Sequence, residues 1–267
     1  MTAPHGVPSD NPHLQAREFF DRIADDYRTR SLTAVYNVSS LSFRRRQDTV
    51  TRMLLRTPPG GLVLDYGMGP AVFGPAAAAH GLRYVGIDIS ERMVQMAREL
   101  QLPNAEFHVG DLNSLGRYTA QADTVLLIGL IDYLQEPGDG LRRLARCVKP
   151  GGRLIMSFRN HVSLPRATRS AAKQAWRLWR RSRGAARTAF AAPVLENSFV
   201  PGRDLAPVLR AEGFDDPVVE FLDCSPVLFN LPLPRRVWEW WRRADEVLGR
   251  RAPTLLCASG VLMAEKR

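Results

Sequence analysis

Aspartates stand where three of the predicted strands end, and the first leads into a turn with two glycines. Asp65 precedes Gly67 and Gly69 in the stretch VLDYGMGPA, and Asp88 follows Gly69 by nineteen residues. Glycines let the backbone turn tightly and let a ligand approach the main chain. The interval to Asp88 is close to the ~20 residues at which a carboxylate reaches ribose hydroxyls from such a turn. The pattern therefore predicts a nucleotide-like ligand.

The carboxylate of Asp65 discriminates between two kinds of cofactor. A pyrophosphate favours bare amide groups at a helix N-terminus, and a neighbouring carboxylate would repel it. The third glycine of a dinucleotide-binding fingerprint would also fall on Val72. S-adenosylmethionine carries an ammonium and a sulfonium group, which a carboxylate attracts. This turn is therefore better suited to S-adenosylmethionine, although a strand-to-helix turn without any ligand is the structural alternative.

Asp111, in the stretch HVGDLNSL, follows the third predicted strand. Its carboxylate could accept a hydrogen bond from an adenine amino group, with Leu112 beside the ring. An aspartate in this position also commonly caps the helix that follows, and the sequence leaves both roles open.

These residues must be positioned by an alternation of strands and helices. An amphipathic helix is expected over 16–30 and a second helix over 43–56. Apolar runs then predict strands at 61–66, 83–88, 105–109, 123–130, 152–158, 217–222 and 253–265. The intervening helices are 76–81, 91–100 with Ser90 as N-cap, 138–148 and 200–214. Such alternation is typical of an α/β fold with a mostly parallel sheet and helices on both faces.

The ordered motifs of residues 17–160 resemble those of class I S-adenosylmethionine-dependent methyltransferases of the small-molecule type. The matching stretches are VLDYGMGPA, YVGIDISERMVQMAREL, EFHVGDLNSL, ADTVLLIGLIDYL and LRRLARCVKPGGRLIMSF. The resemblance implies a seven-stranded sheet whose last strand is inserted antiparallel. It also implies which residues bind the cofactor: Asp65, Gly67 and Gly69 at the methionine end, Asp88 at the ribose, Asp111 and Leu112 at the adenine, and Ile89, Met93 and Gly129 in the same motifs.

Two further positions are compared with the family pattern. Tyr27 matches an N-terminal tyrosine that covers the cofactor, and ordinary helix packing is its alternative. Ala71 stands where the family often has a third glycine, a small-for-small change that we expect to be tolerated.

Candidate catalytic residues follow the fourth and fifth strands. Methyl transfer mainly requires that the acceptor and the methyl group are aligned and that water is excluded. A base is needed only if the acceptor arrives protonated, and a histidine suits an oxygen acceptor. Asp132, Tyr133 and His161 are the candidates, with a helix cap, core packing and a surface loop as their respective alternatives. No metal site is predicted.

Charge is concentrated in one part of the chain. The 267 residues have a net charge of +10, and residues 141–195 contain fourteen Lys and Arg but no Asp or Glu. Such a zone favours anionic partners, or is simply a solvated face. The stretch IGLI after the fourth strand lacks the Asn/Asp-Pro-Pro-aromatic run of enzymes that methylate nucleic-acid bases, so nucleic acid is an unlikely partner.

The remaining predictions concern organisation and location. We expect a disordered lead over 1–13, a helical cap over 14–58 and a methyltransferase core over 59–267. Insertions at 159–197 and 223–253 would form a lid on the acceptor side, and their basic, tryptophan-containing helices could instead lie on a membrane surface. Three cysteines far apart suggest buried free thiols in a reducing cytoplasm. No signal peptide or membrane span is recognised.

The most favoured function is methyl transfer from S-adenosylmethionine to an oxygen or nitrogen of a small hydrophobic or anionic acceptor. Metabolites of specialised, quinone, tetrapyrrole or lipid-linked pathways belong to this class. RNA methylation through the basic zone is one alternative. The other is a cofactor-binding protein that has lost the activity or uses the fold for another reaction.

Overall fold

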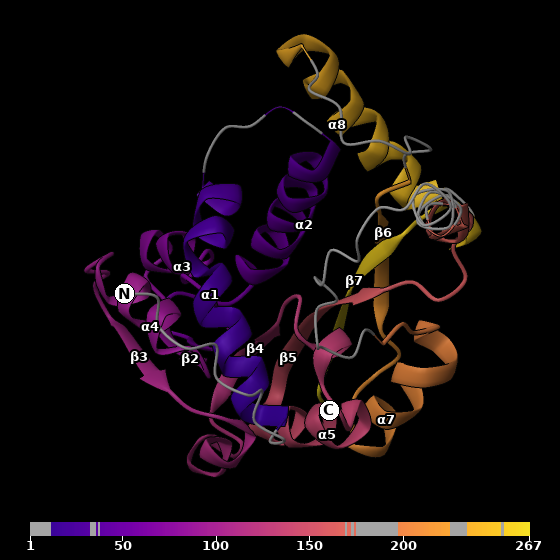
Figure 1. Ribbon diagram of the computed structural model, residues 1–267. Coiled ribbons are helices and arrows are strands. Elements are labelled where there is room, and N and C mark those ends of the chain that lie inside the picture. Colours follow the sequence, from indigo (N-terminus) through magenta and orange to yellow (C-terminus); the bar gives the residue numbers. More distant parts are fainter. Residues whose placement is uncertain are drawn as a thin grey trace.

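The computed structural model describes residues 12–32, 36, 38–168, 170, 171, 174, 197–224, 234–251 and 254–267. Within them, seven strands form one sheet in the order β3-β2-β1-β4-β5-β7-β6 (Figure 1). The strands are β1 (Leu62–Tyr66), β2 (Arg83–Asp88), β3 (Ala105–Val109), β4 (Ala122–Leu127), β5 (Val148–Arg159), β6 (Val218–Leu222) and β7 (Ser259–Glu265). The predicted α/β fold class is confirmed.

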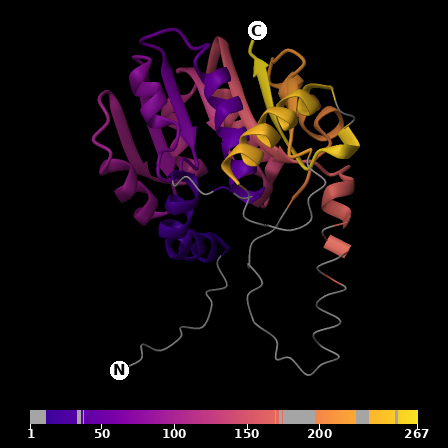
Figure 2. The same ribbon diagram turned by 90° about the horizontal axis from the view of Figure 1, so that it is seen from above.

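Strand directions agree with the prediction as well. β7 is antiparallel to both of its neighbours, β5 and β6, and the other pairings are parallel. Asp65 is paired with Gly86, and Asp88 with Val109, so the strand-end aspartates come to one edge of the sheet. Figure 2 shows the N-terminal half of the chain, in indigo to magenta, on one side of the molecule and the C-terminal part on the other.

Helices cover both faces of the sheet and bury a separate core on each. One core involves residues of α2 (Val38–Leu54), α3 (Gly74–Ala79) and α4 (Glu91–Arg98). The other involves η1 (Leu112–Tyr118), α5 (Pro137–Cys147), η3 (Pro201–Leu205) and α7 (Ala206–Ala211). Alternate strand residues serve the two cores: Leu62 and Leu64 pack on one side, and Val63 packs on the other. Ser90 caps α4 as predicted, because its hydroxyl accepts from the Met93 amide.

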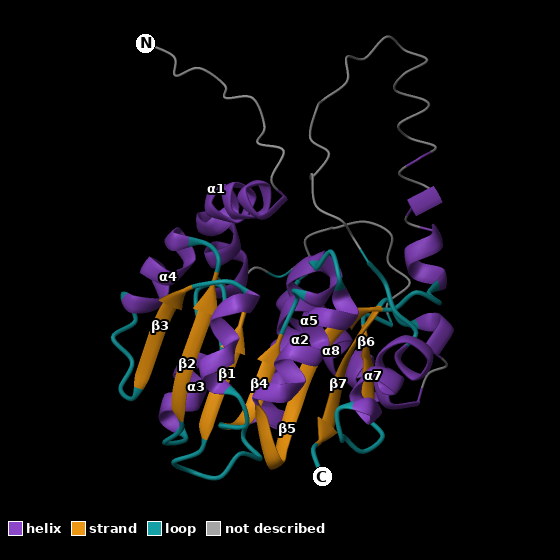
Figure 3. Ribbon diagram, turned by 90° about the horizontal axis from the view of Figure 1, so that it is seen from below, coloured by secondary structure: helices purple, strands orange, loops and turns teal. Residues whose placement is uncertain are grey.

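The first helix lies beyond the sheet, at the edge where the parallel strands end. α1 (Pro12–Leu32) packs against α4, and Figure 3 shows it across one end of the sheet. It begins two residues inside the predicted disordered lead, and residues 1–11 lie outside the described residues. Most of the first predicted insertion, 175–196, lies outside them too. The second insertion contributes α8 (Arg235–Arg251), which packs on β6 and α2.

One prediction about the cysteines was wrong. Cys224 and Cys257 form a disulfide, and only Cys147 is a buried free thiol. The two partners are 33 residues apart in sequence and come together because β6 and β7 are neighbours in the sheet. Sequence spacing alone does not reveal that neighbourhood. None of the helices in the described ranges combines the length and the apolar character that a bilayer span needs.

Candidate functional site

A cavity of about 270 Å³ opens at the carboxyl edge of β1, β2 and β4. This volume is close to the lower limit of about 300 Å³ for pockets that bind small ligands. Nine of the ten predicted cofactor residues line it: Tyr27, Gly67, Gly69, Asp88, Ile89, Met93, Asp111, Leu112 and Gly129. The tenth, Asp65, lies behind the wall of this cavity.

The glycine turn after β1 has the conformation that its residues suggest. Gly67 and Gly69 have φ of +71° and +57°, a region that side chains disfavour. The Gly67 amide donates to the Ile87 carbonyl at 2.7 Å, which fixes the turn to β2. A Cβ on Gly69 would lie 3.5 Å from Cε1 of Tyr27, so that ring covers the turn. Ala71, at φ +54°, is also left-handed, which explains why a glycine would suit this position.

Asp88 ties the turn to the end of β2. One carboxylate oxygen accepts from the Gly69 amide and the other from the Ser90 amide, each at 2.9 Å. Burial raises the pKa of Asp88, and these two N–H groups counteract part of that increase. Each carboxylate oxygen retains a second lone pair, and the residue lines the cavity. Asp88 is therefore placed to accept hydrogen bonds from two ligand hydroxyls.

Asp65 is buried beneath the turn, with 1% of its surface exposed. Tyr84 donates its hydroxyl proton to the carboxylate at 2.5 Å. Burial raises the pKa of Asp65 to about 7, the Tyr84 hydrogen bond lowers it, and the negative charge of Asp88 raises it further. Asp65 lines a small second cavity that shares Tyr27 and Gly67 with the main one. Its charge therefore acts on a ligand from behind the turn rather than by direct contact.

Asp111 performs the capping role that the sequence left open. Its carboxylate accepts from the Asn113 amide at 2.9 Å and from the Asn113 side chain at 3.0 Å, at the start of η1. Both Asp111 and Leu112 still line the cavity, opposite the glycine turn. The two roles that we considered for Asp111 are thus compatible in one geometry.

Aromatic residues close the side of the cavity nearest α1. Phe20 and Tyr133 are in edge contact with ring centroids 6.0 Å apart, and Tyr27 contacts Phe43 in the same way at 5.8 Å. Phe20 was not among the predicted site residues. Other lining residues that we missed are Ala16, Tyr66, Ile128, Leu130, Leu134, Gln135, Glu136 and Asp139. Most of these follow β4, where the sequence lacks a pattern that says which side chains turn inward.

The three candidate catalytic residues lie in different places. Tyr133 lines the cavity. Asp132 is buried beside it, in η2 (Ile131–Tyr133), and accepts from the Arg159 amide at 3.0 Å. His161 is exposed, contacts Ser198 at 2.9 Å and is not a lining residue. The structure therefore brings only Tyr133 to the cavity.

Arg159 connects two of these candidates. Its guanidinium donates to the Tyr133 hydroxyl at 2.7 Å and lies 3.5 Å from the Asp132 carboxylate. Burial raises the pKa of Asp132, whereas the positive charges of Arg159, Arg166 and Arg46 lower it. Arg159 thus pairs with a carboxylate behind the aromatic wall. The charged residues that line the cavity itself, among them Glu136 and Asp139 near Tyr133, are acidic.

Comparison with known families agrees with this geometry. A family model described as a methyltransferase domain matches residues 40–220. The chain belongs to this family.

Several known methyltransferases resemble this one. The ubiquinone biosynthesis O-methyltransferase of Coxiella burnetii is 30% identical over 107 residues, which are 39% of this chain and 46% of that protein. The chain thus matches less than half the length of this curated relative. Magnesium protoporphyrin IX methyltransferase from Synechocystis PCC 6803 with bound SAH is 21% identical, covers 96% of this chain and 100% of that one, and has a TM-score of 0.62.

A structure named for a different activity has the same TM-score. A [4+2]-cyclase, 18% identical, covers 98% of this chain and 99% of the other with a TM-score of 0.62. At these identities the likeness shows the fold. The predicted family is confirmed, and with it S-adenosylmethionine as its cofactor.

The methyltransferase site suits that cofactor on its own geometry. Gly67 and Gly69 line the cavity with main chain alone, and a Cβ on Gly67 would overlap Leu130, while Asp88 presents carboxylate lone pairs to the same cavity. Asp65 adds a negative charge beneath the turn, which favours a cation and disfavours a pyrophosphate. The residues present therefore fit a cationic nucleoside.

Proposed function

We propose that the protein transfers the methyl group of S-adenosylmethionine to an oxygen or nitrogen of a small hydrophobic or anionic acceptor. The observation that carries the proposal is the single cavity that collects nine of the ten predicted cofactor residues. When bound, S-adenosylmethionine supplies a methyl group already activated by its sulfonium charge. The protein's own task is then to bind, orient and exclude water.

Each part of the cavity has a role in this proposal. Asp88 accepts from the ribose hydroxyls, and Asp111 with Leu112 holds the adenine. Asp65 favours the positive charges at the methionine end. Tyr27 covers the glycine turn, and the edge contact of Phe20 with Tyr133 keeps water from the acceptor side.

The acceptor class follows from the residues beside Tyr133. The wall of Phe20, Leu130 and Leu134 is apolar, which suits a hydrophobic acceptor. Arg159 lies behind Tyr133, and a guanidinium there would suit an anionic group of the acceptor, because it matches a carboxylate in geometry. Arg159 fixes the Tyr133 hydroxyl at 2.7 Å, so Tyr133 is our first candidate for contact with the acceptor. Asp132 then positions Arg159, and His161 is retained as a candidate base for a hydroxyl acceptor.

Loss of cofactor binding in Asp88→Ala tests the cofactor assignment. S-adenosylmethionine at about a hundred times its Kd should stabilise the wild type by about 2.7 kcal/mol, seen as a higher melting temperature. Asp88→Ala should lose this shift. Asp123→Ala is the matched control, because Asp123 also accepts from a main-chain amide, that of Leu62, but lies outside the cavity. An undiminished shift in Asp88→Ala would refute the assignment.

A labelled-methyl screen tests the transfer itself. Acceptors with and without a carboxylate are compared for release of S-adenosylhomocysteine, and Arg159→Met should raise KM for anionic acceptors while leaving cofactor binding unchanged. Methyl incorporation into RNA with a steep salt dependence would instead support the RNA alternative. The similar fold of a [4+2]-cyclase supports the alternative that the site serves another reaction. Absence of S-adenosylhomocysteine release with every acceptor would favour this alternative.

A further inference from the structure

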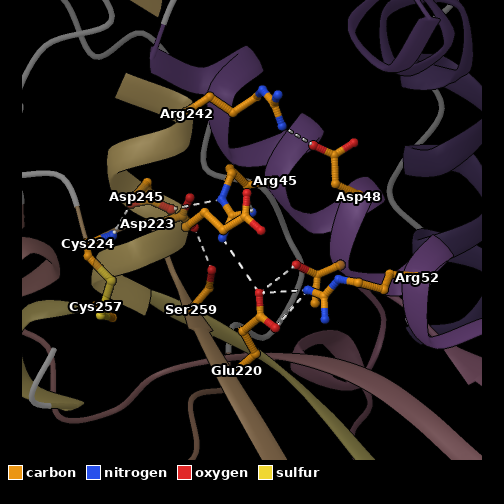
Figure 4. Close-up of polar contacts among 12 residues, drawn as sticks. Arg45, Asp48, Arg52, Glu220, Asp223, Cys224, Arg242, Asp245, Cys257 and Ser259 are labelled. Carbon is orange, nitrogen blue, oxygen red and sulfur yellow. Dashed lines mark hydrogen bonds and ion pairs between the residues drawn. A yellow bond between two sulfur atoms is a disulfide. The ribbon is translucent and has the colours of Figure 1, made fainter. Parts of the chain in front are cut away.

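Helix α8 faces the protein with its polar side. Asp245, with 1% of its surface exposed, lies 3.4 Å from Arg45 of α2 and accepts from the Cys224 amide at 2.8 Å (Figure 4). One turn further, Gly249 lies against the main chain of Phe221, so closely that a side chain there would overlap the Phe221 carbonyl oxygen. The face of α8 that packs on the sheet and on α2 thus contains buried charges and a glycine beside one buried aromatic residue, Trp238, which donates to Ser40 of α2.

The opposite side of α8 carries large apolar side chains in solvent. Trp240 is 67% exposed, Val247 55%, Leu248 46% and Val237 41%. In chain order, Val237, Trp240, Val247 and Leu248 are separated by three, seven and one residues, which places all four on one side of the helix. A helix of a globular domain normally turns such a stripe toward the core.

Two other segments add exposed apolar residues beside α8, at the carboxyl edge of the sheet. Val162 and Leu164 follow β5, and Leu255 and Leu256 belong to η4 (Thr254–Leu256), three residues after α8 ends. Asn160 joins the two segments, because its side-chain nitrogen donates to the carbonyls of Val162 at 2.9 Å and Thr254 at 2.7 Å. Eight of the eleven large apolar residues that are exposed in the described part of the chain lie on these three segments.

Basic residues flank this apolar surface. Arg235, Arg236 and Arg243 of α8 are exposed, and the whole helix contains six arginines against three acidic residues. An exposed apolar patch of this kind marks an interaction site, and arginines beside it select an anionic partner. A surface that combines tryptophan and aliphatic side chains with an arginine flank is complementary to anionic lipid headgroups above acyl chains.

We propose that α8, together with residues 161–164 and 254–256, docks on the surface of an anionic lipid bilayer. Residues 161–164 and 254–256 of this surface stand at the same edge of the sheet as the cofactor cavity, so docking would bring the acceptor side of the site toward the bilayer. The acceptor would then be drawn from the lipid phase, as an amphiphile with an anionic group. That last step rests on the proposed function, whereas binding to lipid does not require methyl transfer.

Sedimentation with vesicles tests the docking surface. The full-length protein should sediment with vesicles of phosphatidylcholine and phosphatidylglycerol, less with phosphatidylcholine alone, and less at high salt. Val247→Glu should weaken binding to the anionic vesicles about tenfold, because a carboxylate replaces an aliphatic side chain that the bilayer would bury. Val218→Glu is the matched control: Val218, 62% exposed at the start of β6, lies away from this surface and should leave binding unchanged.

A label at the same position identifies the occupant. Val247→Cys carrying an environment-sensitive fluorophore should shift its emission to the blue only when anionic vesicles are added. Blue emission in buffer alone would mean that another segment or a second copy covers the face, and would overturn the proposal. So would equal binding of Val247→Glu and the wild type, or a change of oligomeric state in Val247→Glu by light scattering. Cofactor binding, measured by the shift in melting temperature, is the control for correct folding, and its result does not depend on whether the protein binds lipid.

Discussion

At the scale of single residues, the cofactor end depends on two carboxylates that the fold treats differently. Asp88 faces the cavity and is held by two amides, whereas Asp65 is buried below the turn and is bonded to Tyr84. Because the pKa of Asp65 is about 7, the group changes charge near neutrality. The chemistry of the turn therefore depends on pH.

Cofactor affinity should rise as the pH increases from 5.5 to 7. The raised pKa means that Asp65 is largely protonated below 7, and a cationic ligand binds more tightly to the ionised form. The dissociation constant of S-adenosylmethionine should fall by about tenfold over this range, as one ionisation permits. Titration calorimetry at several pH values measures it.

Asp65→Asn should remove this dependence, since its amide oxygen can still accept from Tyr84 but carries no charge. Asp123→Asn is the control. Burial raises the pKa of Asp123, but hydrogen bonds from Lys149 and the Leu62 amide lower it by more, so this carboxylate stays ionised throughout. A pH dependence that persists in Asp65→Asn would show that another group titrates.

At the scale of elements, α8 is fastened to α2 by buried charges. Arg45 lies 3.4 Å from Asp245, 3.6 Å from Glu220 and 3.7 Å from Glu246, and its side chain is 1% exposed. Arg242 of α8 pairs with Asp48 of α2 at 2.8 Å, but the side chains of both residues are partly exposed. The two ion pairs join the same two helices and differ mainly in burial.

Replacing the buried arginine should cost far more than replacing the exposed one. Arg45→Met leaves buried carboxylates without their cation, which should lower the free energy of unfolding by about 3–5 kcal/mol. Arg242→Met should lower it by less than about 1 kcal/mol. Urea denaturation gives both values, and hydrogen exchange should locate the loss in α8. Equal effects of the two substitutions would contradict this account.

The contrast between local and long-range contacts explains what could be predicted from the sequence. The glycine turn, Asp88 and Asp111 follow directly from strand ends, so local patterns pointed to residues that line one cavity. Tyr133 was foreseen, but its partner Arg159 comes from the next strand. Arg45 and Asp245 are 200 residues apart, and nothing in either segment names the other. The acceptor side depends on such contacts, and its residues were therefore predicted less completely.

At the scale of the whole molecule, segments far apart in the sequence are joined by one buried cluster of charges. α2 contributes Arg45, β6 contributes Glu220, and α8 contributes Asp245. The disulfide between Cys224 and Cys257 closes the segment that contains α8 and joins the end of β6 to the residues just before β7. The apolar surface proposed for lipid binding belongs to this cross-linked segment. Its shape therefore depends on a covalent bond as well as on packing.

Removal of the disulfide should lower the stability of the protein substantially. A cross-link between residues 33 apart restricts the unfolded chain, which corresponds to about 3–4 kcal/mol in the chain-entropy model. Cys224→Ser with Cys257→Ser should lose this amount in urea denaturation, and a reductant should destabilise the wild type equally but leave the double variant unchanged. The denatured wild type should present one reactive thiol, Cys147, before reduction and three afterwards. Three thiols without reductant would show that the bond does not form in solution, and α8 would then be held only by Arg45 and its carboxylate partners.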